Sequence, residues 1–233
     1  MKKLIVTRSD NNIKEMTDIT HPIIRMFSKK WNADFEIFDH DSDCNDILGR
    51  SHYRIMKVGE RLNEYDKILS IDSDVIITPN CPNLFDIVPF EKVGTIYEDK
   101  GTRQKHRQTI IQEVQKKWGY VNWQEGYLNT GVFIVSSIHK NIFEKEQGEY
   151  WIGFGYDDIH FGWKIHKFNY LIHELDYRFN HTTMFSEPWN GNKSRFDSYI
   201  IHYAGRGCFD CNSRIKQIKK DASLVWSNKN GKI

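Results

Sequence analysis

Two aspartates lie two residues apart, between apolar runs that are typical of buried strand. Asp72 and Asp74 form an Asp-Ser-Asp sequence after residues 68–71 and before residues 75–77. In an extended segment, side chains at i and i+2 point to the same side, so the two carboxylates converge. Paired oxygen ligands of this kind suit Mg²⁺ or Mn²⁺ bound together with substrate phosphates. The alternative is a turn with a capping aspartate, and the surrounding sequence must decide between them.

The elements before this pair predict a parallel sheet. Short apolar runs at 4–6, 35–38 and 68–71 indicate strands, and Pro22 suggests that the first helix begins at residues 20–22. Leu48, Ile55 and Leu62 mark a second helix. This β-α-β-α-β order favours a parallel sheet with right-handed crossovers. Ligands of such sheets bind beyond the carboxyl ends of the strands, where the aspartate pair lies.

The rest of the chain extends this α/β pattern. Further strands are predicted at residues 93–97, 131–136, 170–175 and 199–203, and a basic amphipathic helix begins near residue 213. Residues 98–124 are polar and basic, with a helix in the second half. The part before that helix is predicted to be a mobile lid or acceptor loop, or else a plain solvated face. We expect a catalytic domain at 1–212, with a nucleotide-binding half at 1–97 and an acceptor half at 98–212, followed by a helix and tail at 213–233.

Composition narrows the class of protein. The chain has 233 residues, and its net charge of +2 is too small to argue for a nucleic-acid partner by itself. No apolar stretch approaches the ~18–20 residues that a membrane span needs. Cys208 and Cys211 have zinc or redox spacing, but no second pair completes a four-cysteine site. We therefore expect free thiols and a cytoplasmic protein, bacterial or, if viral, in the host cytoplasm.

Three later segments carry residues that could act with the aspartate pair. The Asn-Thr-Gly sequence at 129–131 precedes a predicted strand, where a small turn lets the backbone approach a ligand. Asp157 and Asp158 open a predicted helix, where capping is the alternative role. His202 ends a predicted strand, before a Gly-Arg-Gly turn at 205–207. A lone strand histidine is commonly structural, but its neighbours here favour a metal ligand.

Taken in this order, the segments resemble the GT-A glycosyltransferases, and most closely the family-8-like group that includes glycogenin-like and lipopolysaccharide galactosyltransferase enzymes. Residues 53–55 match the Tyr/Arg helix of that family, 72–74 its D-x-D motif, and 128–132 its Asn-Ser/Thr-Gly strand. The resemblance runs from Met1 to about Arg206. It implies the GT-A fold, a Rossmann-like, mostly parallel central sheet flanked by helices. The family's usual Gly-x-x-Lys-Pro-Trp ending is absent, and Asp-Asp replaces Asp-Gln-Asp. Residues 151–158 also resemble the Trp-Gly-x-Gly-Glu-Asp segment of inverting galactosyltransferases, so retention or inversion stays open.

The resemblance also implies roles for individual residues. The metal ligands for Mn²⁺ or Mg²⁺ would be Asp72, Asp74 and His202. The carboxylate acting at the anomeric carbon would be Asp158 as first choice and Asp157 as second. The residues expected to bind the nucleotide or donor sugar are Thr7, Asp10, Asn11, Arg54, Ser73, Asn129, Gly131, Gly205 and Arg206. Three aromatic residues could either contact the acceptor or belong to the hydrophobic core: Trp151, Tyr156 and Trp189.

The expected function is therefore metal-dependent transfer of a hexose from a nucleotide-diphosphate sugar, with UDP as the expected nucleotide. The acceptor would be a hydroxyl of a glycan, a glycoprotein or another molecule. One alternative is a nucleotide-sugar or glycan-binding module without turnover. Another is a sugar nucleotidyltransferase, which usually has a glycine-rich loop after the first strand; residues 7–11 contain no glycine.

Overall fold

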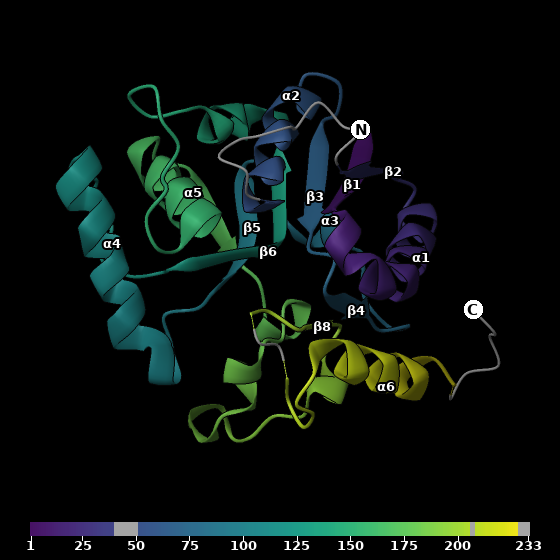
Figure 1. The fold of residues 1–233 in the computed structure, drawn as a ribbon. Helices are drawn as coiled ribbons and strands as arrows, with labels where there is room; N and C mark the ends of the chain where they lie inside the picture. The colour runs from purple at the N-terminus through teal and green to yellow at the C-terminus, as the bar shows by residue number, and fades with distance from the viewer. Residues whose placement is uncertain (40–50, 206–207, 228–233) are drawn as a thin grey trace.

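The computed structural model describes residues 1–39, 51–205 and 208–227. Its centre is a six-stranded sheet with the strand order β2-β1-β3-β6-β5-β7 (Figure 1). The strands are β1 (Lys3–Arg8), β2 (Asp34–Phe38), β3 (Lys67–Ile71), β5 (Lys92–Tyr97), β6 (Leu128–Ser136) and β7 (Leu171–Glu174). β1 is parallel to β2 and β3, and β5 is parallel to β7, whereas β6 runs antiparallel to both of its neighbours. The expected mostly parallel α/β sheet is confirmed.

Helices cover both faces of this sheet because the strand side chains alternate between them. Ile5 of β1 packs on one face with α1 (Lys14–Lys30) and α3 (Leu84–Ile87). Its neighbours Leu4 and Val6 pack on the opposite face. That face is covered by η2 (Ser51–Lys57), α2 (Val58–Arg61), η4 (Ser137–Phe143) and α5 (Tyr156–Lys167).

Two further layers lie beside this core. After η3 (Gly101–Arg103), α4 (Gln104–Trp118) packs against α5 through a cluster of tryptophans that includes Trp118 and Trp163. A separate two-stranded sheet pairs β4 (Val75–Ile77) antiparallel to β8 (Ile200–His202), and α6 (Arg214–Ser227) packs on it (Figure 1). Besides η2, η3 and η4, the 3-10 helices are η1 (Asn11–Ile13), η5 (Tyr177–Phe179), η6 (Thr183–Ser186), η7 (Pro188–Asn190) and η8 (Arg195–Asp197).

The starts of the first helix and of β6 differ most from the sequence prediction. The first helix begins at Lys14 rather than at residues 20–22, so Pro22 lies inside it. Burial of Met16, Thr17 and Thr20 continues the apolar face before the proline, and this packing outweighs the one backbone hydrogen bond that proline removes. β6 begins at Leu128 rather than Gly131. The Leu48 predicted to start the second helix lies outside the described residues.

In the described part of the chain, no helix combines the length and the apolar character that crossing a bilayer requires. Cys81, Cys208 and Cys211 are free thiols.

Candidate metal centre and adjoining pockets

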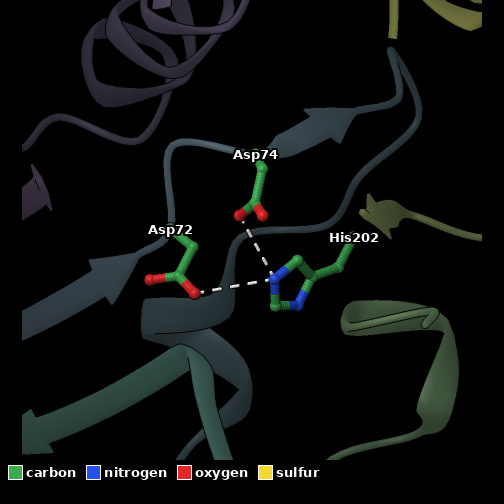
Figure 2. A group of neighbouring side chains, drawn as sticks. All are labelled: Asp72, Asp74 and His202. Carbon is green, nitrogen blue, oxygen red and sulfur yellow. Dashed lines mark ion pairs between the residues drawn. The ribbon is translucent and has the colours of Figure 1, made fainter. Parts of the chain in front are cut away.

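Asp72, Asp74 and His202 meet beyond the carboxyl end of β3, an inner strand of the central sheet. Nε2 of His202 lies 3.5 Å from Oδ2 of Asp72 and 3.3 Å from Oδ1 of Asp74. In Figure 2 the imidazole lies with this nitrogen toward both carboxylates. One ligand atom from each residue lies within 4.8 Å of the other two. The structure therefore brings together the three side chains that the sequence predicted as metal ligands.

The strand pairings of three separate segments create this meeting point. Asp72 follows β3, and its amide nitrogen donates to the Gly131 carbonyl of β6 at 2.9 Å. Asp74 precedes β4, and its carbonyl accepts from the Tyr203 amide at 2.9 Å. His202 ends β8, which pairs with β4. Because β6 is antiparallel to β3, its first residues lie beside the carboxyl end of β3 rather than at the opposite edge.

Gly131 leaves the space that the histidine ring occupies. A Cβ at this position would collide with Cε1 of His202 and would lie 2.6 Å from Nδ1. Only glycine permits this approach of the ring to the β6 backbone. The glycine of the Asn-Thr-Gly sequence therefore has a direct steric role at the site.

A chain of side chains fixes the orientation of His202, which is 2% exposed. Nδ1 of His202 lies 2.7 Å from Oδ1 of Asn180, and Nδ2 of Asn180 donates to Oδ1 of Asn129 at 2.8 Å. Nδ2 of Asn129 lies 3.5 Å from Oε1 of the buried Glu98. Because the Asn180 oxygen can only accept, Nδ1 carries a proton, and Nε2 is the ring nitrogen that would bind a metal between the aspartates. Sequence reasoning missed Asn180 and Glu98.

Two arginines, also missed from the sequence, contact the aspartates. Arg8 donates to Asp72 and lies 3.1 Å from Oδ2 of Asp157. Arg214, the first residue of α6, lies 2.9 Å from Oδ2 of Asp74. Arg8 gave one sequence signal: it is a charged residue two positions after the apolar run at residues 4–6. Arg214 gave none, because it begins a helix full of other basic residues.

The three residues fit a hard divalent cation. Two carboxylates and one imidazole suit Mg²⁺ or Mn²⁺, and the imidazole favours Mn²⁺. Burial alone would raise the pKa of Asp74, but the neighbouring His202 ring and the Arg214 guanidinium lower it to about 2. This carboxylate is therefore ionised, as a metal ligand must be.

Asp157 and Asp158 face the sheet rather than capping their own helix. Gly155 occupies the N-cap position of α5 with φ 83°, a left-handed conformation that favours glycine. Oδ2 of Asp157 lies 2.9 Å from the Thr130 hydroxyl. Oδ1 of Asp158 accepts from the Thr130 amide at 2.8 Å, and Oδ2 lies 3.4 Å from the Tyr127 hydroxyl. Both carboxylates are thus held beside the metal-ligand candidates.

The environment of Asp158 favours its neutral form. Burial is the largest cause, followed by the negative charges of Asp157 and Glu98, and together they raise the pKa of Asp158 to about 7. The hydrogen bonds from Thr130 act in the opposite direction but do not outweigh them. A carboxyl group with a pKa near neutrality can accept and release a proton under physiological conditions.

Two pockets meet at the aspartates. A pocket of about 180 Å³ lies on the side of β1 and α1, and includes Asp10 and Ser73. A pocket of about 320 Å³ extends towards α5, and includes Asn129, Gly131 and Asp158. Both pockets are also lined by a shared set of residues: Arg8, His52, Asp72, Asp74 and Arg214. A larger pocket of about 550 Å³, near Pro79 and Leu224, shares no residue with either.

The other residues predicted to bind the donor differ in whether they line a pocket. Gly205 lines the larger of the two pockets at the aspartates. Thr7 is fully buried, with its hydroxyl 3.1 Å from that of Ser73, so it supports the site from behind. Arg54 donates to the Ser9 carbonyl at the edge of the smaller pocket. Asn11 begins η1, and Arg206 lies outside the described residues.

The three aromatic candidates for the acceptor do not come together. Tyr156 lines the larger pocket, stacked 5.2 Å from the ring of His52. Trp151 is 6% exposed and packs on Trp118 in the core between α4 and α5, so it is not available to an acceptor. Trp189 is absent from the lining of both pockets at the aspartates. Sequence reasoning missed Phe154, which is exposed at the rim of the larger pocket.

The basic segment before and within α4 is largely ion-paired. Arg103 and Arg107 both contact the buried Glu98, and Arg107 also lines the larger pocket. Lys100 pairs with Glu174, and Lys117 with Glu149. These side chains are therefore tied to neighbouring acids, and whether the segment moves as a lid remains a prediction.

Solved glycosyltransferase structures have a fold similar to that of this chain. No protein-family model matches the sequence, and no curated protein matches it. A glycosyltransferase involved in glycosylation of the major capsid of PBCV-1 has 15% identity and a TM-score of 0.57, over 97% of this chain and 100% of the other. The galactosyltransferase LgtC, solved with donor and acceptor sugar analogues, has 15% identity and a TM-score of 0.59, over 96% of both chains.

The bifunctional glycosyltransferase WbbM has 14% identity and a TM-score of 0.62, and the match covers 97% of this chain but 50% of WbbM. At these identities the likeness concerns the fold. The chain has the GT-A glycosyltransferase fold that the sequence motifs predicted.

Proposed function

We propose that this protein is a metal-dependent glycosyltransferase that moves a hexose from a nucleotide-diphosphate sugar, with UDP as the expected nucleotide, to an acceptor hydroxyl. The observation that carries the proposal is the convergence of Asp72, Asp74 and His202 where two pockets meet. A nucleotide on one side and a sugar on the other would place the diphosphate beside these ligands. The GT-A fold supports the same assignment by analogy.

The smaller pocket is the proposed nucleotide site. It lies beyond the carboxyl end of β1, where parallel sheets bind nucleotides, and includes Asp10 and Ser73. When bound, Mn²⁺ or Mg²⁺ would stabilise the negative charge that develops on the departing diphosphate. Asp72, Asp74 and His202 would hold that cation, and Arg8 and Arg214 would offset the remaining phosphate charge.

The larger pocket is the proposed site of sugar transfer. Asp158 lies in it with a pKa of about 7, so at neutral pH it can take the proton of an acceptor hydroxyl. Asp157 is paired with Arg8, and this contact would hold its carboxylate in a fixed position near the anomeric carbon. This division of roles favours Asp158 as a general base. The exposed ring of Phe154, and the face of the half-buried Tyr156 ring that does not stack on His52, are apolar surfaces on which a sugar acceptor could stack.

The test is release of free nucleoside diphosphate from UDP-glucose, UDP-galactose and their N-acetyl forms. We expect release with Mn²⁺, its loss on chelation of the metal, and recovery when Mn²⁺ is restored. Asp74→Asn should abolish it because a charge and a ligand are lost together. Asp176→Asn, which changes a surface aspartate paired with Arg178, is the matched control. Binding of a nucleotide sugar without release of nucleoside diphosphate would favour a binding module instead.

A further inference from the structure

Each aspartate among the proposed metal ligands has one carboxylate oxygen in contact with an arginine guanidinium. Nη1 of Arg214 lies 2.9 Å from Oδ2 of Asp74, and Nη2 of Arg8 contacts Oδ1 of Asp72. The other oxygen of each aspartate faces Nε2 of His202, at 3.3 and 3.5 Å. Each carboxylate therefore directs one oxygen to an arginine and the other to the cation site.

The two arginines differ in how firmly they are held. The side chain of Arg8 is 10% exposed and is shared between Asp72 and Asp157. The side chain of Arg214 is 36% exposed, and apart from Asp74 it lies 3.5 Å from the Gly205 carbonyl. Arg214 lines both pockets. Rotation of its side chain can thus carry the guanidinium from Asp74 to an anion bound in either pocket.

The charge on Arg214 acts in opposite directions on the two ligands of the site. A divalent cation that enters alone meets a positive charge already paired with Asp74, and like charges a few ångströms apart repel strongly in a partly buried site. A nucleotide diphosphate brings negative charge into the same space. A guanidinium is a forked donor that matches phosphate oxygens, so it attracts this second ligand.

We propose that Arg214 makes the cation and the nucleotide diphosphate bind together, because it weakens binding of the cation alone and strengthens binding of the diphosphate. Arg214 is a positioning residue that acts through Asp74 and the phosphates and takes no part in bond making. The inference rests on the proposed function. Since coupling between two ligands is reciprocal, the effect can be measured from either ligand.

The experiment measures binding rather than activity. Mn²⁺ is titrated into the protein and followed by the paramagnetic resonance signal of free Mn²⁺, with and without saturating UDP. UDP affinity is measured separately by calorimetry, with Mn²⁺ present. The variants are Arg214→Gln, Arg214→Lys and, as a control on the same helix, Lys219→Gln, whose side chain pairs with Glu15 at the surface.

We expect Arg214→Gln to bind Mn²⁺ alone several-fold more tightly and UDP roughly tenfold more weakly, so that the coupling between the two ligands falls. Arg214→Lys keeps the charge and should retain most of the coupling. Lys219→Gln should match the wild type. A loss of folding in Arg214→Gln would instead weaken the binding of both Mn²⁺ and UDP and lower the melting temperature of the variant.

Two failures are distinguishable. If the wild-type protein binds neither Mn²⁺ nor UDP, the proposed function is wrong and the inference fails with it. If the wild type binds both, but Arg214→Gln behaves like Lys219→Gln or changes both affinities in the same direction, the inference alone is overturned.

Discussion

The β6 backbone at Gly131 lies so close to the His202 ring that a Cβ at position 131 would collide with Cε1. Gly131→Ala should therefore push the imidazole away from Asp72 and Asp74, and reduce Mn²⁺ affinity by roughly tenfold or more. The matched control is Gly94→Ala, which collides with Ile134 and Val88 in the core. The control should lower the melting temperature but keep Mn²⁺ affinity. Equal Mn²⁺ affinity in both variants would show that the position of the ring does not matter.

Asn180 orients the same ring from its other nitrogen, at 2.7 Å. Asn180→Ala should weaken Mn²⁺ binding by about 10- to 100-fold, the usual effect of losing a residue that orients a metal-bound histidine. Ser198→Ala is the comparison, because Ser198 makes the equivalent contact at 2.7 Å to His181, a buried histidine outside the site. Calorimetric titration with Mn²⁺ separates the two, and an equal effect from Ser198→Ala would indicate general destabilisation.

Asp158→Asn should reduce kcat far more than donor affinity. A group that acts on charge developing in the transition state contributes to rate rather than to ground-state binding, and its loss costs roughly 10²–10³-fold in kcat. Asp157→Asn should cost less, since that carboxylate is held by Arg8 as a fixed charge. Steady-state kinetics and UDP binding are measured on both variants. A loss of donor binding with kcat preserved would remove Asp158 from the catalytic role.

The raised pKa of Asp158 also predicts how stability depends on pH. The folded pKa of about 7 lies above the ordinary value of 3.8, so the folded state holds a proton that the unfolded state releases. This contribution to stability is complete below about pH 4 and is lost as the pH rises through about 7. Asp158→Asn has no carboxyl group to titrate at this position, so the variant does not lose this stability as the pH rises. Its melting temperature relative to wild type should therefore be higher at about pH 8 than at about pH 4. A difference that is constant with pH would contradict the assignment.

The sequence predicted the parts of the fold and site that depend on neighbouring residues. Asp72 and Asp74 could be found because they are two residues apart after a buried strand. The strands and the α/β order followed from short apolar runs. The first helix was placed too far along the chain because Pro22 suggested a start, whereas tertiary packing extends the helix back to Lys14. His202 was singled out because it ends a predicted strand before a Gly-Arg-Gly turn, and the family resemblance then implied its role as the third ligand.

The groups around the ligands could not be predicted, because they meet through long-range pairing. Arg214 is 140 residues from Asp74, and Asn180 is 22 residues from His202, in a segment of short 3-10 turns without a periodic pattern. Trp151 illustrates the reverse error. From the sequence, an aromatic residue near the acidic pair could stack on a sugar or belong to the hydrophobic core. Only the packing between α4 and α5 assigns Trp151 to the core.

The central claim is that His202, with Asp72 and Asp74, holds a divalent cation that the nucleotide diphosphate shares. It is tested most directly by pulsed paramagnetic resonance of the protein with Mn²⁺ and UDP, which detects a nitrogen bound to the metal. The account predicts a ligand nitrogen in the wild type, its loss in His202→Gln, and its retention in His52→Gln, which alters a second histidine lining both pockets. Bound Mn²⁺ without a ligand nitrogen in the wild type, or a nitrogen that persists in His202→Gln, would contradict it.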